Sequence, residues 1–156
     1  MGEFNFQKLV PHSDVDPRKV PLLTFGNVRD KRIRAALGIL GSADLARDIS
    51  MDNIAKAVNL SPSRLRHLFT QEVGETPHGC VRLMRMLRAR ELLEKSFYTI
   101  KEIMVMVGYC DASHFSRDYK KCFSVSPSLT RRASLHRKQS PLSQSVQQIA
   151  VSANEK

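Results

Sequence analysis

Two stretches of the chain decide its fold: IAKAVNLSPSRLRHLF at residues 54–69 and IMVMVGYCDASHFSRDY at residues 103–119. When they are aligned, matching residues lie 49 positions apart before a central break, as in Ile54 and Ile103, and 50 apart after it. A fixed internal offset of this length indicates one supersecondary unit that the chain uses twice.

Each repeat has the sequence form of a helix-turn-helix. An apolar segment with a helical period breaks at Asn59 in the first repeat and at Gly108 in the second. A residue that caps helix N-termini follows the break, Ser61 in one repeat and Asp111 in the other. A short helix, a tight turn and a capped second helix are therefore expected twice.

The segments around the repeats are also helical in pattern. Helix-period or helix-start signals occur at residues 33–40, at Thr76-Pro77, at Thr99 with Glu102, and at Ser126-Pro127. Strand-like alternation appears nowhere over a useful length. The sequence predicts an all-α, homeodomain-like fold of about seven helices, in which one long linker helix joins two helix-turn-helix units.

Three parts are expected along the chain. Residues 1–29 contain three prolines and no helical period, which suggests an arm or the stub of a preceding domain. Residues 139–156 are rich in Ser and Gln and are expected to form a disordered tail. The domain at 30–138 would hold a first helix-turn-helix at about 51–73, the linker helix at about 77–95 and a second helix-turn-helix at about 100–123. We slightly favour a fragment of a longer protein over a small complete one.

The charge, the apolar runs and the cysteine spacing of the chain indicate which classes of protein it could belong to. The chain has 156 residues with 25 Lys and Arg against 15 Asp and Glu, a net charge of +10, which suits a partner that carries many phosphates. No apolar run approaches the roughly 20 residues that span a bilayer, and no signal peptide is visible, so a cytoplasmic protein is expected. The three cysteines lack the C-x-x-C spacing of a zinc finger.

The repeats, together with RMLRARELL at residues 85–93 and VGYCDASHFSRDYKK at residues 107–121, resemble the AraC/XylS family of bacterial transcription regulators. The resemblance covers about residues 30–132. It implies a sequence-specific double-stranded DNA-binding regulator, more often an activator, that contacts two adjacent major-groove segments. Its implied partners are promoter DNA and RNA polymerase, and its implied place is the bacterial cytoplasm, associated with the nucleoid.

The resemblance also implies which residues contact DNA. Base contacts fall on Ser63, Arg66, His67, Ala112, Ser113, His114 and Arg117. Contacts to the DNA backbone fall on Arg64, Lys120, Lys121 and Arg131. Either histidine could instead sense pH or support local packing, and Arg66 could be a solvated surface arginine.

The chain departs from the family pattern at three positions of the second unit. Met104 stands where a small alanine is usual, Ser124 replaces a glycine and Thr130 replaces a tyrosine, which puts the fit of that unit in question.

Other classes of function receive less support. Cys110 and His114 lie four residues apart, but no third ligand or catalytic base accompanies them, so we expect no metal site, cofactor, small-molecule site or enzyme activity. The alternative function is a basic helical adaptor that binds acidic protein partners.

Overall fold

The computed structural model describes residues 28–47 and 49–139, and this part of the chain forms seven helices and no strand. The helices are α2 (Lys31–Ser42), α3 (Met51–Ala57), α4 (Pro62–Val73), α5 (Pro77–Lys95), α6 (Ile100–Met106), α7 (Ala112–Phe123) and α8 (Pro127–Gln139). The predicted all-α fold is confirmed. Residues 1–27 of the arm predicted at 1–29, and residues 140–156 of the tail predicted at 139–156, lie outside the described residues.

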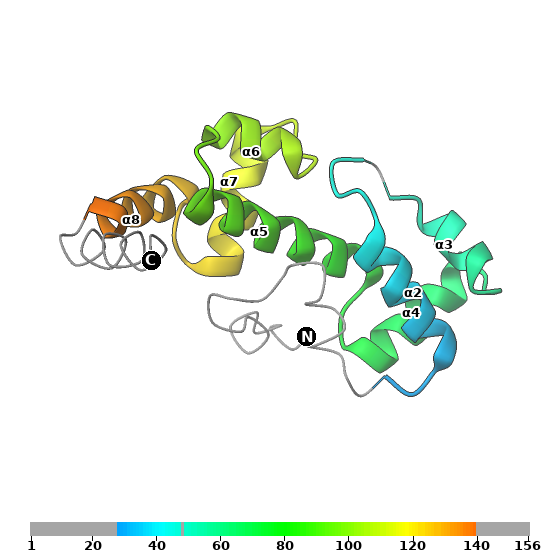
Figure 1. Cartoon of the computed structure of the whole chain (residues 1–156). Helices are drawn as coiled ribbons and strands as arrows, with labels where there is room; N and C mark the ends of the chain where they lie inside the picture. The colour runs from blue at the N-terminus through cyan, green and yellow to red at the C-terminus, as the bar shows by residue number, and fades with distance from the viewer. Residues whose placement is uncertain (1–27, 48, 140–156) are drawn as a thin grey trace, which may run out of the picture.

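The long helix α5 joins the two halves of the molecule (Figure 1). Helices α2, α3 and α4 pack on one another at one end of α5, and α4 contacts α5. Helices α6, α7 and α8 each pack on α5 as well. Helix α5 supplies Cys80, Val81 and Met84 to the first hydrophobic core. It supplies other residues, such as Met86 and Leu93, to the second core. One rigid helix therefore belongs to both cores and fixes how far apart they lie.

The internal repeat extends to the geometry of the turns. Asn59 and Gly108 are matching residues, and both have a positive φ, 54° and 77°. The residue after each closes the turn by donating its backbone N–H into the preceding helix: Leu60 to the Ala55 carbonyl at 2.9 Å and Tyr109 to the Met104 carbonyl at 3.0 Å. The two turns thus have the same hydrogen-bond pattern, and the sequence repeat is a structural one.

The second helix of each unit also begins in the same way. The Ser61 hydroxyl accepts from the backbone N–H of Arg64 at 3.2 Å, and the Asp111 carboxylate accepts from that of His114 at 2.6 Å. Each contact satisfies one of the N–H groups that a helix leaves free at its start. The cap residues inferred from the sequence are therefore the observed caps.

Two of the three departures from the family pattern, Met104 and Thr130, fit the residues around them. Met104 is buried in the second core. Thr130 accepts a 3.0 Å hydrogen bond from the hydroxyl of Tyr119, whose counterpart in the first unit is Phe69. A buried hydroxyl needs such a partner, so the polar Thr130 suits the extra oxygen of Tyr119.

Ser124 is the departure that leaves the backbone in an unfavourable conformation. It ends α7 with φ 60°, while Gly74 ends α4 with φ 79° at the matching position. A residue with a side chain is destabilised by about 1–2 kcal/mol in the left-handed region, where glycine is not. Glycine, however, loses about 0.5–1 kcal/mol more conformational entropy on folding, which offsets part of this difference.

The Ser124→Gly variant is therefore expected to raise the free energy of unfolding by up to about 1 kcal/mol. Gly74→Ser is the matched reverse change and is expected to lower it by a similar amount. Urea unfolding of the full chain measures both. A loss of stability in Ser124→Gly would contradict the argument.

Candidate nucleic-acid interface

Helices α4 and α7 expose and bury matching positions. Both helices bury three matching side chains: Leu65, Leu68 and Phe69 in α4, and Phe115, Asp118 and Tyr119 in α7, which also buries Cys122. The positions between them are exposed in both helices. The structure places all seven side chains predicted to contact bases on these exposed faces: Ser63, Arg66, His67, Ala112, Ser113, His114 and Arg117.

Three of the four residues predicted to contact the DNA backbone are also exposed. Arg64 lies in the first turn of α4, and Lys120 and Lys121 lie in the last turn of α7. Arg131 differs, because its guanidinium donates to the backbone carbonyls of Ser96 and Tyr98. In this structure the side chain of Arg131 attaches α8 to the loop that joins α5 and α6.

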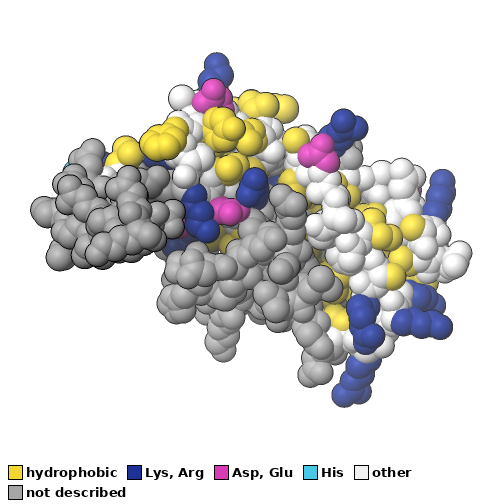
Figure 2. Space-filling view, viewed as in Figure 1, with side chains coloured by type: hydrophobic (Ala, Val, Ile, Leu, Met, Phe, Trp, Pro, Cys, Tyr) yellow, Lys and Arg dark blue, Asp and Glu magenta, His cyan; other side chains and the backbone are white. Residues whose placement is uncertain are grey.

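Basic side chains gather beyond the two helices as well. Figure 2 shows Lys and Arg side chains projecting from the end of the molecule formed by α2, α3 and α4. The N-termini of α4 and α7 add partial positive charge, because the first N–H groups of a helix point out of its end. These features favour an anionic partner on the surface around both helices.

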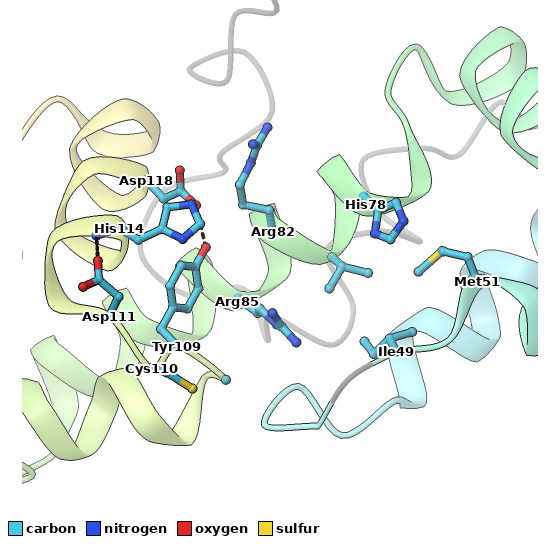
Figure 3. A pocket seen from close by; sticks show the side chains of 12 residues that line it. Ile49, Met51, His78, Arg82, Arg85, Tyr109, Cys110, Asp111, His114 and Asp118 are labelled. Atoms are coloured by element: carbon cyan, nitrogen blue, oxygen red, sulfur yellow. Dashed lines mark hydrogen bonds and ion pairs between the residues drawn. The ribbon is translucent and has the colours of Figure 1, made fainter.

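A cleft of about 390 Å³ lies between the two units (Figure 3). Met51, the first residue of α3, borders it on one side, and His114 near the start of α7 borders it on the other. His78, Arg82 and Arg85 of α5 line it between them. The lining also includes Asp111 and Asp118, so arginines and aspartates both face the cleft. The start of a helix from each unit therefore borders one shared cleft.

Arg85 and Gly108 form the contact between the two units. The guanidinium of Arg85 donates to the backbone carbonyl of Arg47, in the loop between α2 and α3, at 2.9 Å. A Cβ atom on Gly108 would lie 2.6 Å from the Leu45 carbonyl oxygen and 3.1 Å from Cζ of Arg85. The turn of the second unit thus approaches the loop of the first so closely that only glycine fits.

A buried polar pair in the second unit was not anticipated from the sequence. Asp118 is 8% exposed, and its Oδ2 accepts a 2.7 Å hydrogen bond from the Tyr109 hydroxyl. The signal lay in the repeat itself, because the matching residues of the first unit are Leu60 and Leu68. The polar replacement of two apolar residues marks a difference between the units.

The three cysteines fall into two environments. Burial raises the pKa of the Cys80 thiol to about 12 and that of Cys122 to about 11. Cys110 is exposed in the turn before α7. Only a thiolate reacts as a nucleophile, so burial and a raised pKa both protect Cys80 and Cys122.

We expect one rapid equivalent of thiol labelling by a disulfide reagent in the native protein at pH 8, and two more only after unfolding. The Cys110→Ser variant is expected to remove the rapid phase and leave the slow ones. Two rapid equivalents in the native protein would contradict the burial of Cys80 and Cys122.

Residues 28–47 and 49–139 contain neither a metal-binding cluster nor a membrane-spanning helix. This part of the chain has no cluster of three His, Cys, Asp or Glu side chains that could hold a metal ion. No helix in it is long and apolar enough to cross a membrane.

Comparison with known proteins identifies the repeated unit. A family model described as a helix-turn-helix domain matches residues 54–133. The arabinose operon regulatory protein of Escherichia coli K12 is 34% identical over 99 residues, which are 64% of this chain and 34% of that protein. The chain spans about a third of the length of such curated relatives.

Solved structures show the same fold. A transcriptional regulator from Chromobacterium violaceum, of a class with AraC-type DNA-binding domains, is 29% identical with a TM-score of 0.61, over 66% of this chain and 91% of that one. The DNA-binding domain of AdpA, solved with its target DNA, is 20% identical with a TM-score of 0.61, over 71% of this chain and 100% of that one.

Proposed function

The chain belongs to the AraC/XylS type of helix-turn-helix family, and on that premise we propose that it is a sequence-specific double-stranded DNA-binding regulator of transcription. The observation that supports this best is the matching exposure of α4 and α7. Each helix buries the same three positions and leaves exposed the positions proposed to contact bases. We take residues 30–138 as the DNA-binding domain.

Helices α4 and α7 would enter two successive major-groove segments on one face of the duplex, about 34 Å apart. Arg66 and Arg117 would bind base edges, since an arginine paired with guanine is the commonest specific contact. The other base contacts proposed are Ser63, His67, Ala112, Ser113 and His114. The contact through Arg85 and Gly108, with α5, would set the spacing of the two helices.

The proposed place of action and protein partner are inferred from family membership alone. The chain would act at promoters in the bacterial nucleoid, more often as an activator, with RNA polymerase as its protein partner. Binding, not catalysis, would be its activity. The named relatives regulate operons or transcription, and none is named as an enzyme.

The proposal is tested by selecting bound duplexes from a random pool at physiological salt. The expected result is a preferred sequence with two conserved blocks about one helical turn apart. A chain that retains every duplex equally would contradict the proposal. Binding to acidic proteins in the same experiment would support the adaptor instead.

Lys120 provides a prediction about the DNA backbone. Lys120→Ala is expected to weaken binding equally on the selected and on a random duplex, because a phosphate contact carries no sequence information. It should also reduce the slope of log affinity against log salt by about 1. Titrations at several salt concentrations measure both effects. A loss confined to the selected duplex would make Lys120 a base contact.

A further inference from the structure

The two recognition helices differ in what lies beneath them. Under α4 the matching pair is Leu60 and Leu68, and both side chains belong to the first core. Under α7 the pair is Tyr109 and Asp118, each 8% exposed and joined by the 2.7 Å hydrogen bond from the Tyr109 hydroxyl. The same fold is thus built once with an apolar pair and once with a polar one.

Packing alone does not explain the polar pair. Burying a carboxylate costs several kcal/mol unless it is well partnered, whereas a leucine at the same position costs nothing of this kind. Burial, followed by the hydrogen bond to Asp118 and its charge, raises the pKa of Tyr109. The Tyr109 hydroxyl therefore stays protonated, and keeps donating to the carboxylate, across the pH range in which proteins are normally stable.

The carboxylate has a second neighbour on the exposed side of α7. His114 lies one helical turn before Asp118, and its Nε2 is 3.7 Å from the same Oδ2 that accepts from Tyr109. The imidazole also meets the Tyr109 ring edge-on, with centroids 5.6 Å apart and an angle of 68°. Figure 3 shows the three side chains grouped at one wall of the cleft.

The imidazole of His114 contacts other side chains of its own unit along one edge and is exposed along the other. Its side chain is 62% exposed, so the imidazole is open to a partner on the outside while Asp118 and Tyr109 contact its inner edge. A carboxylate near one ring nitrogen favours the ring orientation that keeps that nitrogen toward it. The matching residue in the first unit, Arg64, has Leu68 below it and no such support.

We propose that Asp118 and Tyr109 are positioning residues that orient His114 and thereby set the base preference of α7 at one base pair. This inference rests on the proposed function. Oriented imidazole groups discriminate between bases because a hydrogen bond to a base edge depends on direction. Without the support, His114 would sample several rotamers and contact different base edges equally well.

The test compares the base preferences of full-length variants, each selected from a random duplex pool. Asp118→Asn keeps an acceptor for Tyr109 but removes the charge, Asp118→Leu copies the first unit, and Tyr109→Phe keeps the ring but removes the donor. Each is expected to lower the preference at one base pair in the block bound by α7 by about fivefold or more. The block bound by α4 and the affinity for random duplexes should stay unchanged.

A double-mutant cycle separates positioning from a structural role. His114→Ala alone should lower the same preference, and adding Asp118→Asn to it should have no further effect. The nuclear Overhauser contact between the His114 and Tyr109 rings should weaken in Asp118→Asn, while the imidazole signals of His67 stay in place as an internal control.

The outcomes that overturn the inference are distinct. Unchanged preferences in all three variants, or an equal loss of affinity on every duplex, would refute positioning while leaving the proposed function intact. A His114→Ala variant with the wild-type preference would refute it as well. A wild-type chain that selects no sequence would refute both.

Discussion

Replacing Gly108 by alanine is expected to lower the free energy of unfolding by about 2–5 kcal/mol. The first reason is the φ of 77°, which disfavours any residue with a side chain. The second is the 2.6 Å approach of a Cβ to the Leu45 carbonyl oxygen, a backbone atom that cannot rotate away. Urea unfolding measures the stability, and titration with the selected duplex measures the accompanying loss of affinity.

Gly74→Ala is the matched control for this variant. Gly74 has a similar φ of 79°, but among the described residues nothing lies within 4 Å of a Cβ placed there. Its replacement is expected to lower the free energy of unfolding only through the backbone conformation, by up to about 1 kcal/mol, with the DNA affinity of the folded protein retained. Equal losses in the two variants would mean that the units are not in close contact at Gly108.

Replacing Arg66 or Arg117 by alanine is expected to cost about 1–3 kcal/mol of binding free energy on the selected duplex and to relax the preference at one base pair each. Both side chains are exposed, so the stability of the fold should change little. Losses from the two variants should add, because they lie in different units.

Arg132→Ala is the control for these two changes, since Arg132 is an exposed arginine of α8 and is not among the proposed contacts. It removes the same charge and should weaken binding only slightly, on all duplexes alike. If Arg66→Ala and Arg117→Ala lose affinity equally on selected and random duplexes, the two arginines contact phosphates and not bases.

The helices could be predicted from the sequence because their boundaries depend on local signals. Ser61, Thr76, Thr99 and Asp111 each cap a helix through an atom within three residues, and such contacts leave a readable pattern. The repeat added a second, independent test of each boundary. The exposure of the candidate base-contacting residues followed from the helical period of their apolar neighbours.

The contacts between distant segments could not be predicted in this way. The side chain of Arg131 was expected at the DNA backbone, yet in the structure it donates to the carbonyls of Ser96 and Tyr98, about 35 residues earlier in the chain. The bond from Arg85 to the Arg47 carbonyl spans 38 residues. Nothing local marks either carbonyl as an acceptor, because both depend on how the helices pack.

The two units are therefore equivalent in backbone and different in detail. The polar pair of Tyr109 and Asp118 replaces two leucines, and Ser124 takes a conformation that Gly74 takes without strain. These differences all lie in the second unit. The two units are expected to contribute unequally to sequence preference, with the second more sensitive to substitution.

The central claim is that α4 and α7 bind neighbouring major grooves on one face of a duplex. Methylation interference at guanine N7 on the selected duplex tests it most directly, because that atom lies in the major groove. We expect two clusters of interference about one helical turn apart, one weakened in Arg66→Ala and the other in Arg117→Ala. A single cluster, or two clusters on opposite faces of the duplex, would contradict the claim.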